Sequence, residues 1–260
     1  MINRLFNTPP LRSIGLKSLT ILLILSAPGF FAQSETTQLK KPKIAIIIDD
    51  LGNQYTYGNQ IIEQPLVKTV AVMPQRTYSV ELSKIAYDTN KEVIIHMPMD
   101  NNGRFPMGKL GLSVDFDKDE TFSTLEMAFA ENPYATGLNN HTGSFYTEHA
   151  ENMSWVMQYL KRNNKFFIDS RTSAKSQGII QAKKQNLAWA GRHIFLDNNK
   201  DFESLMTQWE QALKIANKNQ EVVIIGHPYP ETIAFLKQLD KNDLMIHFEF
   251  VKASELLNRI

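Results

Sequence analysis

Residues 43–52 read KIAIIIDDLG, a run of five apolar residues followed by two adjacent carboxylates and, soon after, a glycine. An unbroken run rich in isoleucine is typical of a strand that is buried on both faces. Such strands belong to parallel sheets covered by helices, and these folds carry their chemistry just past the carboxyl ends of the strands. Carboxylates are costly to bury without a cation or hydrogen bonds, so Asp49 and Asp50 mark a candidate site. The alternative is a strand-to-loop turn in which both aspartates are solvated.

The composition limits the class of protein. The 260 residues suffice for one large domain or two small ones, and a hydrophobic content of 43% can supply a substantial core. A net charge of +1 gives no indication of nucleic acid as a partner. The chain has no cysteine, which excludes disulfides and thiolate chemistry. It also lacks the GxSxG and HExxH motifs and a glycine-rich phosphate loop after the first strand.

The amino-terminal region has the layout of a secretory signal peptide. Three basic residues precede an apolar core at 19–27, and Ala32 suits the last position of the signal. Phe30 is large for a cleavage site, so an uncleaved anchor stays open, although the apolar core is shorter than the roughly 20 residues of a membrane span. We therefore expect a signal peptide or anchor at 1–32, a linker at 33–42, a folded domain at 43–260, and a periplasmic or otherwise exported location.

The rest of the chain alternates between expected strands and expected helices. Strands are expected, besides the first, at 68–73, 92–97, 135–139, 165–168, at 187–191 or 194–196, and at 221–226 and 244–250. Helices are expected at 57–63, 78–90, 119–132, 151–163, 174–186, 202–217, 230–238 and 253–258. This rhythm predicts a (β/α) barrel or a doubly wound sheet.

Polar side chains follow the ends of these strands. They are Asp49, Asp50, His96, Asn140, His141, Asp169, Arg192 and His227. Because strand ends converge on one face of a barrel, these residues are expected to share a site. A single histidine in such a place is more often packed or hydrogen-bonded than a ligand, but several at the same level favour a site. Two histidines and one carboxylate can hold a divalent metal with open positions, which suits hydrolysis of an amide or an ester.

The motifs IIIDDLG, IHMPM, NNHTGS, FIDSRT, GRHIFLDN and IIGHPYPET occur in that order from about residue 43 to the carboxyl terminus. Together they resemble the divergent polysaccharide deacetylase family, a distant branch of the chitooligosaccharide deacetylase-like carbohydrate esterases. The resemblance implies an α/β fold that is an irregular (β/α) barrel of the polysaccharide deacetylase type. It also implies a divalent metal, most simply Zn²⁺, and a hydrolase that removes acetyl groups from N-acetylated sugars, acting on C–N bonds other than peptide bonds.

The same resemblance implies roles for individual residues. Asp49 matches the general base, Asp50 a metal-binding aspartate, and His227 the catalytic acid. His96 matches a metal-binding histidine, but Asp100 occupies the position four residues later where the typical family has a second histidine. His141 is the best candidate for that missing ligand, with Asp100 next. The substrate or the catalytic groups would be oriented by Asp169 and Arg192, with Asn140, Ser144 and Ser170 as weaker members of the same shell.

The leading hypothesis is therefore a metal-dependent deacetylase of cell-envelope saccharides, whose partner is an acetylated polysaccharide or oligosaccharide. No nucleic acid is expected, and the membrane is expected only through an uncleaved amino-terminal segment. The unusual ligand pattern keeps a rival open, a catalytically inactive glycan-binding or envelope-scaffold protein on the same fold. An esterase that removes O-acetyl groups would use the same site.

Overall fold

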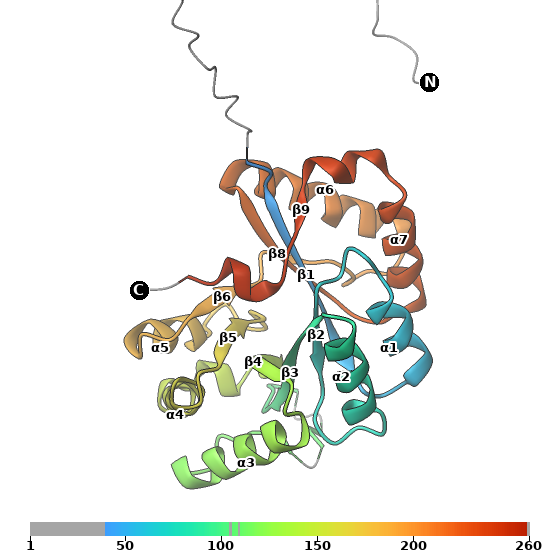
Figure 1. The fold of residues 1–260 in the computed structure, drawn as a ribbon. Coiled ribbons are helices and arrows are strands. Elements are labelled where there is room, and N and C mark those ends of the chain that lie inside the picture. Colours follow the sequence, from blue (N-terminus) through green and yellow to red (C-terminus); the bar gives the residue numbers. More distant parts are fainter. Residues whose placement is uncertain (1–39, 104–105, 109, 259–260) are drawn as a thin grey trace, which may run out of the picture. The chain divides into compact units, whose positions relative to one another are not determined.

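The computed structural model describes residues 40–103, 106–108 and 110–258, in which parallel strands, the first strand among them, curl into an open barrel (Figure 1). The predicted signal segment and most of the linker lie outside these residues. The strands are β1 (Lys43–Leu51), β2 (Thr69–Val72), β3 (Glu92–Met99), β4 (Ala135–Thr142), β5 (Phe166–Asp169), β6 (Trp189–Gly191), β7 (Ile194–Phe195), β8 (Glu221–Gly226) and β9 (Glu249–Phe250).

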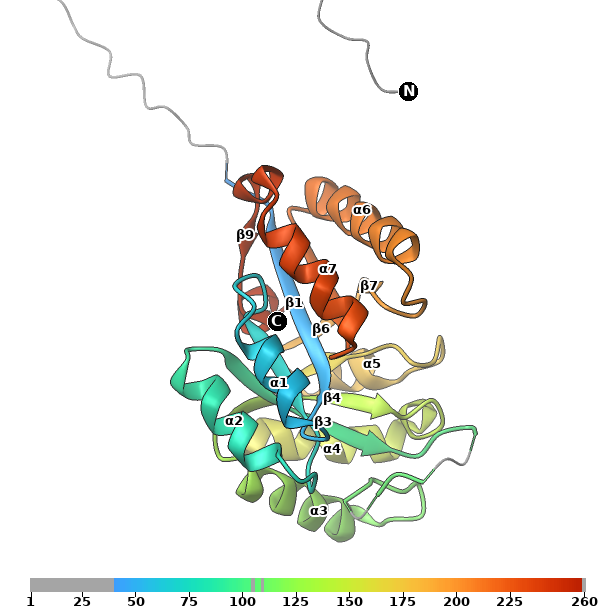
Figure 2. The ribbon, with the colours of Figure 1, turned by 90° about the vertical axis from the view of Figure 1, so that its right-hand side faces the viewer.

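Helices surround the outside of the curled sheet. They are α1 (Tyr55–Ile62), α2 (Ser79–Asp88), α3 (Lys118–Glu131), α4 (Ala150–Arg162), α5 (Gly178–Lys184), α6 (Phe202–Asn219) and α7 (Pro230–Asp240). Short 3-10 helices lie at Tyr146–Glu148, Asp243–His247 and Ala253–Leu256. Figure 2 shows α1 and α7 side by side over β1, and the two helices contact each other. Within the described ranges, no helix is both long and apolar enough to cross a membrane.

Every strand pairing in the described part of the chain is parallel. The strand order is β6-β5-β4-β3-β2-β1-β8-β7, and β9 adds beside the first residues of β1. The end strands β6 and β7 follow each other in the chain but are not neighbours in that order, so the barrel stays open between them. The fold is thus the irregular (β/α) barrel that the sequence predicts.

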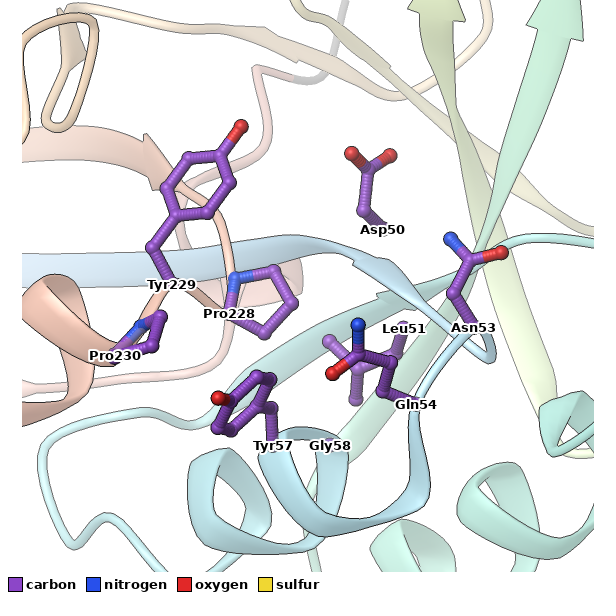
Figure 3. A pocket seen from close by; sticks show the side chains of 9 residues that line it. All are labelled: Asp50, Leu51, Asn53, Gln54, Tyr57, Gly58, Pro228, Tyr229 and Pro230. Atoms are coloured by element: carbon purple, nitrogen blue, oxygen red, sulfur yellow. The ribbon is translucent and has the colours of Figure 1, made fainter.

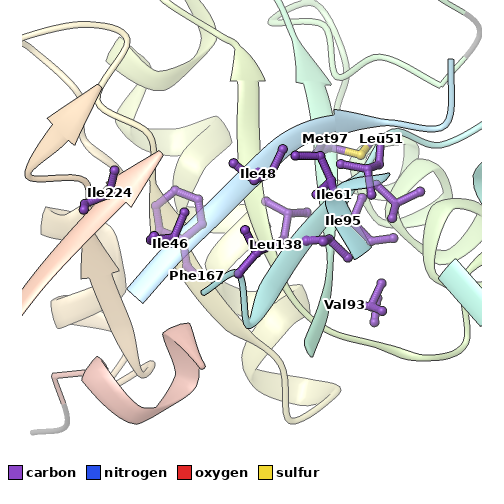
Figure 4. Packing of buried hydrophobic residues seen from close by; sticks show 14 of the residues in the cluster. Ile46, Ile48, Leu51, Ile61, Val93, Ile95, Met97, Leu138, Phe167 and Ile224 are labelled. Atoms are coloured by element: carbon purple, nitrogen blue, oxygen red, sulfur yellow. The ribbon is translucent and has the colours of Figure 1, made fainter. Parts of the chain in front are cut away.

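Alternating side chains of β1 separate two hydrophobic clusters. Ile44, Ile46 and Ile48 join the larger cluster, which includes side chains of the surrounding helices (Figure 4). Ala45 and Ile47 belong to a smaller cluster inside the barrel, together with residues of the other strands and of the 3-10 helix Ala253–Leu256. That 3-10 helix lies at the end of the barrel where the strands begin, because the N–H groups of Ala253 and Ser254 bond the side chains of Thr69 and Glu92 there. The candidate site residues lie at the opposite end, where the strands end.

Three predicted elements differ from the structure. Residues 174–177 lie outside α5, because the hydroxyl of Ser176 accepts from the N–H of Gly178 and donates to Asp169. Most of the expected strand at 244–250 is the 3-10 helix Asp243–His247, where the Asn242 side chain accepts from the N–H of Leu244, and only Glu249–Phe250 pairs with β1. The expected helix at 253–258 is a short 3-10 helix. The two alternatives at 187–191 and 194–196 both form short strands.

Candidate metal centre

Three predicted metal ligands meet where β1, β3 and β4 end. Asp50 Oδ1 lies 3.2 Å from His96 Nε2 and 3.0 Å from His141 Nδ1, and the two histidine nitrogens are 3.1 Å apart. Ligand atoms held about 2.0–2.1 Å from zinc at tetrahedral angles lie roughly 3.3 Å from one another. The three atoms therefore have nearly the spacing that one small cation requires.

A β-bulge brings two consecutive aspartates to this site. Between Ile48 and Leu51, β1 advances three residues while the paired segment of β2, from Val70 to Val72, advances two. Asp49 continues the inward alternation of Ala45 and Ile47, and the next residue of a regular strand would point outward. Asp50 instead has φ 60°, in the left-handed region that non-glycine residues rarely adopt. The extra residue and this backbone turn let both carboxylates serve one site.

Asn139 links the buried carboxylate of Asp49 to the ring of His96. The Asn139 Nδ2 donates to Asp49 Oδ1 at 2.8 Å, and its Oδ1 lies 2.8 Å from His96 Nδ1. An ionised carboxylate can only accept, so the amide oxygen must face the histidine and receive its Nδ1–H. The other ring nitrogen, Nε2, then turns its lone pair toward Asp50 and His141.

The cluster also favours a cation electrostatically. Burial alone would lower the pKa of His96, but the charges of Asp49 and Asp50 raise it to about 9. Burial would raise the pKa of Asp50, yet His141 and His96 hold it far below its usual range. Asp50 Oδ1 is buried and faces the two histidine nitrogens at 3.0 and 3.2 Å. The cluster thus attracts positive charge, and its donor set suits a divalent metal.

His227 is held by a carboxylate from a neighbouring loop. Its Nδ1 lies 2.9 Å from Asp197 Oδ1, while the other carboxylate oxygen accepts from the His227 N–H at 2.6 Å and from the Thr232 hydroxyl at 2.8 Å. Burial would lower the pKa of His227, but Asp197 raises it above its ordinary value. With Nδ1 bound to Asp197, the imidazole has Nε2 left for a substrate.

The residues predicted to orient the substrate differ in the hydrogen bonds that they make within the protein. Asn140 accepts from the N–H of Ser170 and donates to the carbonyl of Thr142, and Asp169 accepts from the N–H of Arg171, so both fasten loops. The Ser170 hydroxyl is buried and has no partner within the described residues. Arg192 is half-buried and donates Nε and Nη2 to backbone carbonyls, at 2.6 and 3.0 Å. Their roles in substrate binding stay predictions.

Asp100, the next candidate for the missing ligand, is not among the residues that meet at the centre. Its Oδ2 accepts from the Ser113 hydroxyl and from the N–H of Val114, so this carboxylate holds the loop after β3. Ser144 also serves that loop, because its hydroxyl accepts from the N–H of Asn102.

The sequence analysis did not identify Asn139 as the partner of His96 or Asp197 as the partner of His227. Asn139 is two residues before His141 on the same strand, so period-two alternation could have placed both side chains on the inner face. Asp197 follows β7, which is too short to be recognised with certainty as a strand.

A cavity of about 190 Å³ begins at Asp50 and extends between the start of α1 and the start of α7 (Figure 3). It is lined by Asp50, Leu51, Asn53, Gln54, Tyr57, Gly58, Pro228, Tyr229 and Pro230. The cavity therefore touches a candidate metal ligand at one side and the residues that directly follow His227 at the other.

A family model and curated relatives both match most of this chain. A family model described as divergent polysaccharide deacetylase matches residues 46–257. The uncharacterized protein YibQ of Escherichia coli (strain K12) is 35% identical over 216 residues, which cover 83% of this chain and 67% of that relative. An uncharacterized protein of Haemophilus influenzae is 33% identical over 195 residues, covering 75% of this chain and 70% of that relative.

A solved structure shares the fold. The crystal structure of the uncharacterized protein ATU2773 from Agrobacterium tumefaciens C58 superimposes with a TM-score of 0.79 at 20% identity, covering 85% of this chain and 91% of that one. At this level of identity the similarity establishes the architecture and nothing about the reaction.

Proposed function

Because the chain belongs to the divergent polysaccharide deacetylase family, we propose that it is a metal-dependent hydrolase that removes acetyl groups from N-acetylated saccharides of the cell envelope. The observation that carries this proposal is the convergence of Asp50, His96 and His141 within 3.2 Å of one another, with Asp49 and His227 nearby. Two histidines and one carboxylate leave coordination positions open, as a hydrolytic site requires.

Asp50, His96 and His141 would hold the metal, and this donor set suits Zn²⁺. A bound divalent cation supplies Lewis acidity, which polarises a carbonyl and lowers the pKa of water. Asn139 contributes by fixing the ring of His96 with Nε2 directed at the cluster. Such outer partners of a ligand typically affect metal affinity as well as ring orientation.

Asp49 is proposed as the general base. Its Oδ1 accepts from Asn139, and burial raises its pKa against the opposing charges of His96 and His227. A raised pKa makes a carboxylate a better proton acceptor near neutral pH. Asp49 would take a proton from the water that attacks the acetyl carbonyl carbon, so that a C–O bond forms at that carbon.

His227 is proposed as the general acid. Asp197 anchors Nδ1 and stabilises the protonated ring, which leaves the Nε2–H free to donate. As the C–N bond breaks, Nε2 would give its proton to the sugar nitrogen, so that acetate and a free amine leave. The two proton transfers together complete the hydrolysis of one amide by one water.

The decisive assay is acetate release from acetylated oligosaccharides in the presence of zinc. We expect the parent protein to release acetate, and Asp49→Asn and His227→Ala each to lower kcat by about 10²–10⁴-fold. His247→Ala is the matched control, since this exposed histidine precedes β9 at the opposite end of β1. Full activity in either site variant would contradict the assigned roles.

The rival glycan-binding function gives a different result in the same experiment. A binding protein would hold the saccharide equally well before and after chelation and would release no acetate on prolonged incubation. A panel that includes O-acetylated sugars separates an amidase from an esterase, because both would use the same residues. Export to the periplasm stays a prediction from residues 1–32, which lie outside the described residues.

A further inference from the structure

The cavity beside Asp50 has two walls of different origin. Asp50, Asn53 and Gln54 come from the end of β1 and the loop before α1 (Figure 3). Pro228 and Tyr229 come from the loop between β8 and α7, and Pro230 is the first residue of α7. Tyr57, from the first turn of α1, closes the cavity between these walls. The contact between α1 and α7 supports both walls from behind.

Apart from Asp50, the polar side chains of this cavity make few hydrogen bonds within the described residues. Gln54 occupies the position before α1 where a side chain often caps the helix, yet its amide makes no capping bond. The Tyr229 hydroxyl and the Gln54 amide have no hydrogen-bond partner among the described residues, and Asn53 has only the Met73 sulfur at 3.8 Å. These groups are therefore available to hydroxyls of a ligand.

The remaining lining is apolar or aromatic, and it contains no basic residue. Rings and prolines pack against the C–H faces of a sugar, while amides and a phenol bond its hydroxyls. The only charged residue in the lining is Asp50, whose carboxylate the proposed cation would neutralise, so the lining presents no free charge to a ligand. A volume of about 190 Å³ is smaller than the roughly 300–1,000 Å³ of sites for drug-sized ligands, and it suits one ring.

We infer that this cavity binds a single pyranose ring, that of the aminosugar that leaves as the free amine. This inference rests on the proposed function, because the acid His227 must reach the leaving nitrogen and Pro228 directly follows it in the chain. A ring in the cavity lies between Pro228 and the metal ligand Asp50, both of which line it. Tyr57, Tyr229, Asn53 and Gln54 then determine which sugar is accepted, while the acetyl group is held elsewhere.

The test combines kinetics with binding of a product. KM and kcat for acetylated chitobiose are measured in the parent and in the variants Gln54→Ala, Tyr57→Ala and Tyr229→Ala. Binding of the deacetylated amine disaccharide is followed by NMR through the backbone amides of residues 53–58. Tyr55→Ala is the matched control, because Tyr55 lies in the same turn of α1 but packs on Tyr78 and does not line the cavity.

We expect each cavity variant to raise KM and the dissociation constant of the amine by about three- to tenfold, with kcat changed less and Tyr55→Ala unchanged. Tyr57 also packs on the core, so Tyr57→Ala could unfold the protein. In that case Tyr57→Phe, together with Gln54→Ala at an exposed position, provides the test. Hydrolysis with unchanged KM in all cavity variants would overturn this inference alone. Amine binding at the cavity without hydrolysis would overturn only the proposed function. If neither amine binding nor hydrolysis is observed, the inference and the proposed function are both overturned.

Discussion

Asp49 and Asp50 are neighbours in the chain but have different environments. Asp49 is buried and hydrogen-bonded to Asn139, and burial raises its pKa. Asp50 lies between two imidazoles, which hold its pKa low. Two carboxylates whose pKa values are moved in opposite directions are suited to different tasks, one to accept a proton and one to stay ionised beside a cation.

Asn139→Ala should weaken zinc binding without removing a ligand. The change deletes the acceptor of the His96 Nδ1–H, so the ring loses its fixed orientation. We expect zinc affinity to fall by about 10–100-fold, measured by competition with a chromophoric chelator. Asn163→Ala is the control, because that side chain donates only to a carbonyl of α4. Unchanged affinity in Asn139→Ala would show that the ligands alone orient His96.

Asp197→Asn should lower the pKa of His227. The Asp197 carboxylate raises this pKa in the folded protein. The attraction between the carboxylate and the protonated His227 ring therefore stabilises the fold fully below pH about 6.5, the ordinary histidine value. This stabilisation is lost as the pH rises through the pKa of the folded protein. The difference in unfolding free energy between parent and variant should therefore be larger at low pH than at high pH. NMR titration of the imidazole signals measures the pKa directly, with exposed His247 as internal reference. A His227 pKa that does not fall would mean that Asp197 only positions the ring.

At the scale of elements, β1 is the strand on which the barrel depends. It pairs with β2, β8 and β9, and its alternate side chains enter both hydrophobic clusters. Its bulge near the carboxyl end then delivers the two aspartates. Loss of packing in this strand should therefore affect the fold and the site together.

Ile46→Ala tests the packing of β1. Ile46 is fully buried, and truncating such a side chain costs about 2–5 kcal/mol because a cavity remains. Ile246→Ala makes the same chemical change at a side chain that is 64% exposed, and should cost less than about 0.5 kcal/mol. Urea denaturation gives both free energies of unfolding. Equal losses would contradict the assignment of β1 as the central strand of the core.

At the scale of the whole molecule, a metal would tie together strands that are distant in sequence. Asp50, His96 and His141 come from β1, β3 and β4, which curl toward one another although β2 separates the first two in the sheet. A ligand that binds only the folded state stabilises it in proportion to the logarithm of its free concentration.

Zinc should accordingly raise the melting temperature of the parent protein. At a free concentration about 100 times the dissociation constant, the gain is about 2.7 kcal/mol. His141→Ala should lose most of this shift, because it removes one of three ligands, whereas His247→Ala should retain it. Differential scanning calorimetry with and without zinc measures the effect. An equal shift in both variants would place the cation elsewhere.

The fold follows largely from local pattern. The apolar run of β1, the alternation of strands with helices and the polar residues at strand ends are all visible in the sequence. They predict a parallel α/β fold, either a barrel or a doubly wound sheet, and the family resemblance selects the barrel. The errors fall where side chains compete with the backbone, as with Ser176 and Asn242. Leu244 and Ile246 also misled the prediction, because apolar residues at alternate positions are typical of a strand. In the structure both are exposed and lie in a 3-10 helix.

The sequence by itself determined which residues lie at strand ends, because burial and period-two alternation are properties of short segments. Only the tertiary structure decided which of them touch. Asn139 and Asp49 are 90 residues apart, and Asp197 and His227 are 30 apart. Such pairs, and the cavity between α1 and α7, depend on how far the sheet curls and on a one-residue bulge in β1. These features arise from packing of the whole chain, so no local pattern could specify them.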